Sequence, residues 1–232
     1  MAKQALLLAG ASGLVGGLAL PALLQRAEPE DWQIVAPARR ALASQHRRLH
    51  TVVCEPGTPK GLAAIERVVS AQGGNIGSFA CTIGSTLRAA GSQEAFAAID
   101  RDLVLALAGI ARRRGARQAI VVSSVGASAT SSNFYLRVKG EMEVGIEALG
   151  FERVDFLQPG LLLGDRGVEK RPGERLGQLL APLFNPLLPG PLRRYRAIGA
   201  DVVAAALVAL VCRPGNGATR HSNLDIETSA DL

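Results

Sequence analysis

Tyr135 and Lys139 are the residues whose types and spacing point most directly to chemistry, because four positions on a helix bring both side chains onto one face. A phenol has a pKa of about 10 and is a poor acid at neutral pH, but a neighbouring ammonium stabilises its phenolate form. Tyr135 could therefore exchange a proton with a carbonyl or alcohol oxygen while a hydride moves to or from a nicotinamide. The same spacing also arises by chance beside an apolar helix stripe, here Phe134, Val138, Met142, Ile146 and Leu149.

Two serines precede this pair, at the end of the apolar run QAIVVSS over residues 118–124. A hydroxyl at the end of a buried strand can hydrogen-bond a substrate oxygen on which charge develops. Ser124 is the first candidate for this role, and Ser123 is the alternative. The predicted catalytic set is therefore Ser124, Tyr135 and Lys139.

A glycine-rich loop lies close to the start of the sequence, between the apolar run QALLLA and an apolar helix pattern. Backbone N–H groups and the positive end of a helix dipole in such a loop can bind a pyrophosphate. The alternative is a turn whose glycines serve only tight packing of strand against helix. The residues predicted to bind a dinucleotide here are Gly10, Ser12, Gly13, Leu14, Val15 and Gly16 in GASGLVG.

Arg39 and Arg40 follow the second apolar run, WQIVAPA, where NAD enzymes usually carry an acidic residue for the ribose 2′-hydroxyl. A planar guanidinium can instead pair with the oxygens of a 2′-phosphate. The pair predicts NADP(H) as cofactor, although two surface arginines would look the same.

Strand and helix patterns alternate along most of the chain. Strands are predicted at 4–9, 32–38, 49–54, 76–84, 118–124 and 153–158, with helices at 14–26, 95–113, 134–149 and 201–212. Ser131, Ser132 and Asn133 are candidate caps of the third helix. This alternation predicts an α/β fold with three layers, a doubly wound parallel sheet of the Rossmann type. We expect a single domain over 1–232, with a small substrate-side lobe over 161–198, where prolines interrupt the pattern.

Composition excludes several other classes of protein. Hydrophobic residues make up 48% of the chain and charged residues 20%, so the chain can bury a core. The uncharged stretch from Gln4 to Gln25 is rich in glycine, which favours strand, turn and helix over a membrane span. The net charge of +6 could indicate a nucleic-acid partner, but no aromatic residues are interleaved with the arginines over residues 39–48. We therefore expect a solvated helix there and no nucleic-acid partner.

Cysteine and histidine usage gives neither a disulfide framework nor a metal signature. Cys54, Cys81 and Cys212 are odd in number and far apart, and the three histidines lack zinc-site spacing. We therefore expect no metal, and a reducing cytoplasm as location.

The motifs GASGLVG, VVSS, YLRVK and QPG resemble those of the short-chain dehydrogenase/reductase superfamily, and the match covers nearly the whole chain. More narrowly, FACTIGSTLRAAG, AIDRDLVL, SSVGASATSSNFYLRVKGEMEV and QPGLLLGDR are similar to the Tat-interacting-protein group of atypical members.

The resemblance implies an NADP-binding domain with a Ser-Tyr-Lys site at Ser124, Tyr135 and Lys139. It also implies that Lys139 binds the nicotinamide ribose. The further positions it implies around the cofactor are Cys81 and Thr82 on the adenosine side, and Pro159 and Gly160 beside the nicotinamide. The chain departs from the family at Gln158, where many relatives have arginine, and at Asp100, where many have an asparagine that completes a proton relay.

These expectations converge on an NADP(H)-dependent oxidoreductase that acts on a carbonyl or alcohol of an unidentified small molecule. The alternative is a non-catalytic, NADP(H)-binding regulatory module that responds to redox state and recruits a protein partner. An isomerase or epimerase with a tightly held cofactor stays open as a third possibility. The helix patterns are compatible with a monomer and with a homodimer.

Overall fold

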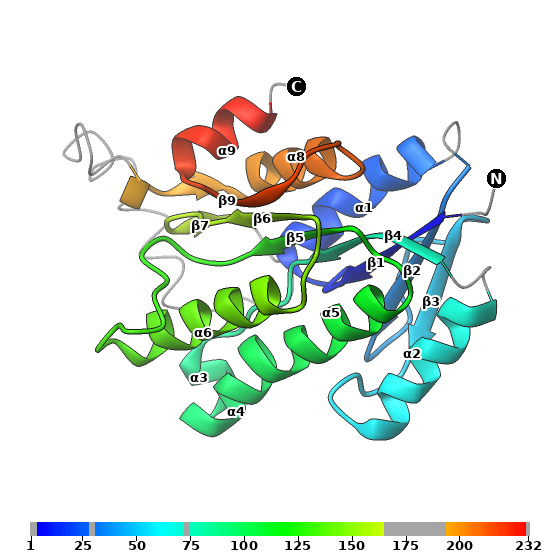
Figure 1. Ribbon diagram of the computed structural model, residues 1–232, viewed down its shortest axis with the longest axis horizontal. Helices are drawn as coiled ribbons and strands as arrows, with labels where there is room; N and C mark the ends of the chain where they lie inside the picture. Colours follow the sequence, from blue (N-terminus) through cyan, green and yellow to red (C-terminus); the bar gives the residue numbers. More distant parts are fainter. Residues whose placement is uncertain (1–3, 28–30, 72–74, 165–193, 231–232) are drawn as a thin grey trace.

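A seven-stranded parallel sheet forms the centre of the computed structural model, which describes residues 4–27, 31–71, 75–164 and 194–230 (Figure 1). Its strands are β1 (Gln4–Ala9), β2 (Gln33–Ala38), β3 (Leu49–Val53), β4 (Asn75–Cys81), β5 (Gln118–Val122), β6 (Arg153–Leu157) and β9 (Gly217–His221). They lie in the order β3-β2-β1-β4-β5-β6-β9, and all neighbours run parallel. The order reverses between β1 and β4, the kind of position where such sheets bind ligands at their carboxyl ends. The predicted Rossmann-type sheet is confirmed.

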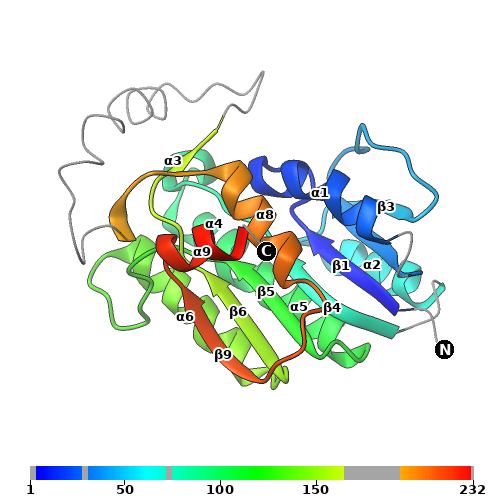
Figure 2. The same cartoon turned by 90° about the horizontal axis from the view of Figure 1, so that it is seen from above.

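Helices cover both faces of the sheet and complete three layers (Figure 1). The upper layer in that view holds α1 (Leu14–Ala27), α8 (Ala200–Leu210) and α9 (Asn223–Ala230), and the lower layer holds α2 (Pro59–Ala71), α5 (Val104–Arg113) and α6 (Phe134–Ala148). Figure 2 looks down on the upper layer, where α1 and α8 pack side by side above the strands.

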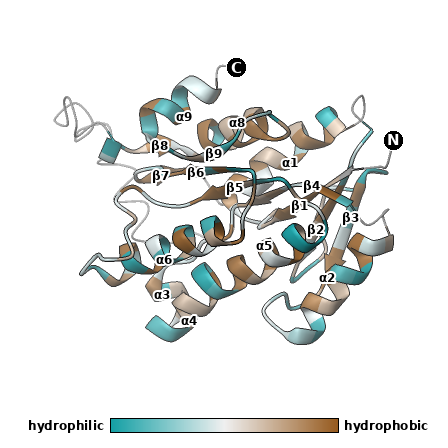
Figure 3. Cartoon of the chain, viewed as in Figure 1, coloured by the Kyte–Doolittle hydropathy of each residue, from teal (hydrophilic) through white to brown (hydrophobic). Residues whose placement is uncertain are grey.

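Each face of the sheet is buried under its own apolar core, because successive strand residues point to opposite sides. In β1, Leu6 and Leu8 enter the core beneath α1 and α8, whereas Leu7 and Ala9 enter the core against α2, α5 and α6. Strands buried on both faces have uninterrupted apolar sequences, and this explains the run QALLLA. Figure 3 shows the hydrophobic strands at the centre and hydrophilic residues mainly on the outer helices.

The turn between β1 and α1 brings backbone segments into very close approach. Gly10 has a φ of +88°, and a Cβ there would lie 2.6 Å from Oγ1 of Thr82. A Cβ on Gly16 would collide with the carbonyl oxygen of Gly10. Thr82 in turn donates a hydrogen bond of 3.0 Å to that carbonyl oxygen. The packing of the turn itself therefore requires glycine at positions 10 and 16, whereas Gly13 lines the neighbouring cavity.

The predicted helix over 95–113 is a continuous helical run with an unexpected middle. It consists of α4 (Gln93–Ala97), the π-helical segment η1 (Ala98–Leu103) and α5. Ser92 begins the run by accepting a hydrogen bond of 3.1 Å from the backbone N–H of Ala95. A π-helical turn inside a helix is rare and often lies at a functional site. The only buried side chain of η1 is that of Asp100.

Several other predictions need correction. The fourth strand ends at Cys81 and not at Gly84, because the chain leaves the sheet there, and the expected solvated helix after β2 is an irregular loop. The short α3 (Leu87–Ala90), α2, α9 and β9 were not predicted. Strand β9 has the polar sequence GATRH and is mostly exposed at the sheet edge, so it lacks the apolar pattern of an inner strand.

Most of the predicted lobe over 161–198 lies outside the described residues. Its described ends pair as a short parallel ladder between β7 (Leu162–Leu163) and β8 (Ile198–Gly199). The lobe and the single-domain boundary therefore stay predictions.

Two neighbouring glycines of α1 allow a matched test of this turn. Gly16→Ala should lower the free energy of unfolding by about 3 kcal/mol or more, because its methyl group meets backbone. Gly17→Ala should be neutral or stabilising by up to about 1 kcal/mol, since its Cβ would lie 3.7 Å from the nearest atom and alanine favours helix. Urea denaturation measures both, and equal effects would contradict the packing argument.

Candidate active site

A cavity of about 230 Å³ opens at the carboxyl ends of β1, β4 and β5, beside the first turns of α1 and α6. Its walls come from five segments that lie far apart in the sequence. They are Gly13–Val15, Thr82–Thr86, Val122–Ser124 with Tyr135 and Lys139, and Pro159–Leu162. The structure therefore brings all three predicted catalytic residues to the wall of one cavity, next to the glycine-rich turn.

The two candidate serines have different hydrogen-bond partners. The hydroxyl of Ser123 donates a hydrogen bond of 2.5 Å to Oε1 of Glu143, and Ser123 is buried. Ser124 is half-buried, and the hydrogen bond of its hydroxyl to the backbone oxygen of Val125 is long, at 3.4 Å. The geometry favours Ser124 as the serine that meets a ligand, because the Ser123 hydroxyl is already committed to a carboxylate.

Tyr135 lies in the first turn of α6 and is half-buried against α4. Asn133 caps this helix by accepting a hydrogen bond of 3.2 Å from the N–H of Leu136. Of the three candidate caps, Asn133 is therefore the N-cap, and Ser131 and Ser132 precede it. The Tyr135 ring packs on Phe96, with ring centroids 5.4 Å apart. The helix start and this ring contact together set the direction of the phenol at the cavity wall.

Lys139 lies one turn further along α6, and its side chain is only 3% exposed. Its Nζ is 2.7 Å from Oδ1 of Asp100, which is fully buried. Burial lowers the pKa of Lys139, but the neighbouring Asp100 carboxylate outweighs this effect, so the pKa lies above the usual value. Lys139 therefore carries a positive charge at the cavity wall.

Glu143 is a functional candidate that the sequence analysis missed. It lies one turn beyond Lys139 and is 1% exposed. Besides Ser123, it accepts hydrogen bonds from Gln158 (2.9 Å) and from Nε of Arg220 (2.8 Å). The departure at Gln158 thus has a structural role, because its amide binds a buried carboxylate. No local signal indicates this group, since Arg220 comes from β9 at the sheet edge.

The residues predicted to hold the dinucleotide fall into distinct places. Gly13, Leu14, Val15, Thr82 and Pro159 line the cavity, Ser12 is exposed beside it, and Gly10 and Gly16 form the packed turn behind it. Arg39 and Arg40 are exposed directly after β2, next to β1 in the sheet. These positions are compatible with one bound dinucleotide that extends from the cavity toward the end of β2.

Cys81 is a correction to the predicted cofactor side chains. Its side chain is 0% exposed and belongs to the core against α5 and α6, because alternation along β4 turns it away from the ligand side. Burial raises the pKa of its thiol to about 12. Its neighbour Thr82 reaches the cavity instead.

Two searches bear on other kinds of site. No group of three or more His, Cys, Asp or Glu residues suited to a metal ion occurs in the described ranges. Among the helices that the structure describes, none has the length and apolar character needed to cross a bilayer.

Curated relatives cover most of the chain. A protein named "Protein fmp52, mitochondrial" from Emericella nidulans is 34% identical over 217 residues, which is 90% of this chain and 89% of the relative. "Protein HTATIP2" from Rattus norvegicus is 39% identical over 137 residues, which is 59% of this chain and 54% of the relative. No protein-family model matches the chain.

Solved structures share the fold at low sequence identity. An ADP-L-glycero-D-manno-heptose-6-epimerase from Helicobacter pylori superposes with a TM-score of 0.65 at 17% identity, covering 95% of this chain and 77% of that one. Aldohexose dehydrogenase from Thermoplasma acidophilum gives 0.64 at 14% identity, covering 94% and 92%. The Bordetella bronchiseptica enzyme WbmH, solved with NAD+, gives 0.64 at 14% identity, covering 95% and 76%.

The expected cytoplasmic location is wrong by this comparison. Relatives that cover about nine tenths of the chain are named as mitochondrial proteins, from Emericella nidulans and from two Aspergillus species. Cysteines without a disulfide pattern indicate a reducing compartment but do not identify which one. Taken with the sheet order and the Ser-Tyr-Lys cavity, the identity to Fmp52 along nearly the whole sequence shows that the chain belongs to the Fmp52 and HTATIP2 family of atypical short-chain dehydrogenase/reductases.

Proposed function

We propose that the protein is an NADP(H)-dependent oxidoreductase that transfers hydride between a nicotinamide and the carbonyl or alcohol carbon of a small molecule. The observation that carries this proposal is the cavity at the switch point of the sheet, where Ser124, Tyr135 and Lys139 lie with the glycine turn. The fold of the solved neighbours supports the general class, since several of them were solved with NAD.

The chain's own residues fit a dinucleotide at this place. Gly13, Leu14 and Val15 form the N-terminal end of α1, and its first turn has no acidic residue. The positive end of this helix is therefore available to a pyrophosphate, which the close packing of Gly10 and Gly16 allows to approach the backbone. When bound, a nicotinamide would supply or accept the hydride.

The catalytic residues would then control the proton and the oxygen. In the reducing direction, Tyr135 donates its phenolic proton to the carbonyl oxygen as the carbon receives hydride, and Tyr135 is left as phenolate. The Lys139 ammonium stabilises that negative charge, and the Ser124 hydroxyl donates a hydrogen bond to the same substrate oxygen. In the oxidising direction, the Tyr135 phenolate accepts the alcohol proton.

Selection of NADP over NAD rests on the exposed arginines after β2. Strand β2 ends at Ala38 and pairs with β1, whose end begins the glycine turn. Arg39 therefore follows the strand at the place where a dinucleotide presents its adenosine ribose. A guanidinium there can form charge-assisted hydrogen bonds to a 2′-phosphate.

The cofactor is tested by titrating the purified protein with NADPH and, separately, with NADH while following the fluorescence of the reduced nicotinamide. NADPH should bind roughly tenfold or more tightly, and Arg39→Ala should remove most of the difference. Arg213→Ala is the matched control, because Arg213 lines a different cleft at the amino ends of the strands. If neither nucleotide binds, the oxidoreductase proposal fails.

Catalysis is tested with Tyr135→Phe, assayed by consumption of NADPH with a panel of aldehydes and ketones. Turnover should be abolished while the affinity for NADPH changes little, because phenylalanine keeps the ring contact with Phe96 and loses only the proton donor. A variant that retains the activity would favour the non-catalytic binding module instead.

The two serines give a separate prediction. Ser124→Ala should lower kcat by about 10²–10³-fold, as expected for loss of a donor to the reacting oxygen. Ser123→Ala should have a far smaller effect on kcat and should act mainly on stability, since its hydroxyl binds Glu143. The reverse order in kcat would assign the active serine to Ser123.

A further inference from the structure

The buried contact between Lys139 and Asp100 is not explained by packing alone. The two side chains are 3% and 0% exposed, and Nζ lies 2.7 Å from Oδ1. The second carboxylate oxygen of Asp100 accepts a hydrogen bond of 2.9 Å from the backbone N–H of Ser85, which lies at the cavity wall. Removing two opposite charges from water is costly, so a buried pair of this kind is weak evidence of a purely stabilising role.

The π-helical segment η1 places this carboxylate. Of its six residues, only Asp100 is buried, while its neighbours Arg101 and Asp102 form an ion pair with each other at 2.7 Å. Asp100 lies between α6 and the loop after β4. A Cβ on Gly84 in that loop would lie 3.8 Å from Oδ1 of Asp100 and 3.8 Å from Nζ of Lys139. The π-helical segment thus places the carboxylate of Asp100 beside Lys139 at the cavity wall.

Besides Asp100, two titratable groups of the described residues interact electrostatically with Lys139. They are Tyr135 on α6 and the buried thiol of Cys81 in β4, whose pKa is raised by burial to about 12. Of the next two acidic residues along the same helix, Glu141 pairs with Arg101 at 2.6 Å, and Glu143 is bound by Ser123, Gln158 and Arg220. Asp100 is therefore the carboxylate that can balance the Lys139 charge.

We propose that Asp100 is a positioning residue for the reaction, and that it holds Lys139 protonated and aimed at the cavity as its internal counter-ion. The proposal rests on the proposed function for its importance to catalysis, but its physical content is independent of turnover. A lysine buried to this degree without a partner favours its neutral form. A neutral amine would lose its stabilising effect on a phenolate, so Asp100 acts on the chemistry through Lys139.

Nuclear magnetic resonance titration of the intact protein tests this directly. The chain has four lysines, Lys3, Lys60, Lys139 and Lys170, so 13Cε-labelled lysine gives few signals, and Lys139→Met identifies the relevant one. In the unchanged protein, Lys139 should titrate above the ordinary lysine pKa of about 10.4. In Asp100→Asn, it should titrate at least ~2 units lower. An unchanged titration in that variant would overturn the proposal.

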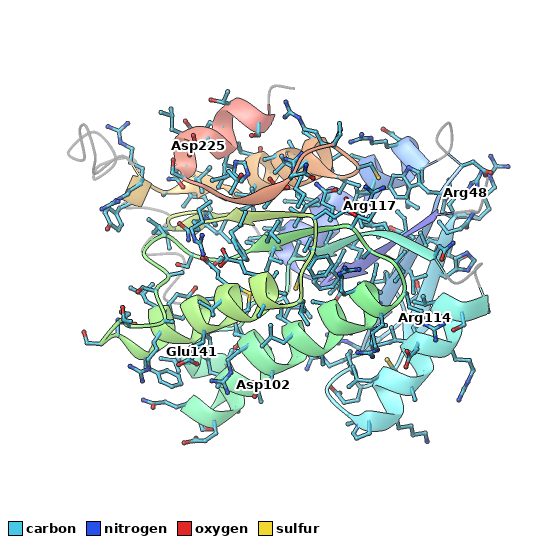
Figure 4. The ribbon with its side chains drawn as sticks, in the orientation of Figure 1. Arg48, Asp102, Arg114, Arg117, Glu141 and Asp225 are labelled. Atoms are coloured by element: carbon cyan, nitrogen blue, oxygen red, sulfur yellow. The ribbon has the colours of Figure 1, made fainter. Side chains whose placement is uncertain are left out.

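Asp102→Asn is the matched control. Asp102 belongs to the same π-helical segment but is exposed, and Figure 4 shows it with Glu141 at the outer surface of the lower helix layer. Both carboxylates bind Arg101. Asp102→Asn should leave the Lys139 titration unchanged, and an equal shift in both variants would also overturn the proposal, because the effect would then be general.

A stability measurement covers the case in which Asp100→Asn folds poorly. If Lys139 is neutral in the folded variant and charged when unfolded, the unfolded state binds more protons, so the free energy of unfolding rises with pH. The deficit relative to the unchanged protein should therefore shrink from pH 7 to pH 10, and adding Lys139→Met should restore folding at pH 7. A deficit that is the same at every pH, or one that Lys139→Met does not relieve, contradicts the counter-ion role.

Neither measurement uses a substrate or a nucleotide. A lowered Lys139 titration in a protein without turnover supports the counter-ion role and counts only against the oxidoreductase proposal. If Asp100→Asn leaves the Lys139 titration unchanged and the unchanged protein is an active oxidoreductase, the counter-ion role is wrong and the proposed function stands.

Discussion

The close approach of Gly16 to the carbonyl group of Gly10 is the constraint on which the rest of the site depends. It brings the start of α1 against the end of β1, and Thr82, directly after β4, donates its hydroxyl to the carbonyl oxygens of Ala9 and Gly10. Because β4 is held there, the chain that follows it passes along the cavity wall before it enters the helical run that carries Asp100. The close backbone contact between Gly10 and Gly16 thus contributes to the position of Asp100, about ninety residues later in the chain.

A second organising feature is the pair of carboxylates buried around α6. Asp100 neutralises Lys139 from one direction, and Glu143 receives Ser123, Gln158 and Arg220 from another. Neither carboxylate binds the Ser124 hydroxyl, whose hydrogen bond to the backbone oxygen of Val125 is long, at 3.4 Å, and Tyr135 lies beside it at the cavity wall. The buried carboxylates therefore hold Lys139 and Ser123 in place, whereas Ser124 and Tyr135 stay available to a ligand in the cavity.

Much of this architecture could be predicted from the sequence, because inner parallel strands and glycine turns leave strong local patterns. The run QALLLA and the glycines after it identified β1 and α1 within one or two residues. The spacing of Tyr135 and Lys139 identified two catalytic candidates without any tertiary information. The alternation of strand and helix patterns predicted the parallel sheet, whereas the order of its strands comes from the structure.

The remaining features depend on contacts between distant segments. Glu143 looks like an ordinary polar helix residue until Arg220 approaches it from β9, 77 positions away. The burial of Cys81 and of Lys139 depends on which face of β4 and α6 meets the core, and Asp100 depends on a π-helical turn that has no sequence signature of its own. Edge strand β9 escaped detection because solvent, not a second core, covers most of its residues.

That edge strand also sets the order in which the site can be completed during synthesis. The glycine turn, Asp100 and Lys139 all leave the ribosome before Arg220, which follows Lys139 along the chain. Domains made at about 5–20 residues per second can begin to collapse before translation ends. A nascent chain that has not yet released β9 would therefore lack the guanidinium partner of Glu143, and this part of the cavity wall becomes complete only when β9 joins the sheet edge.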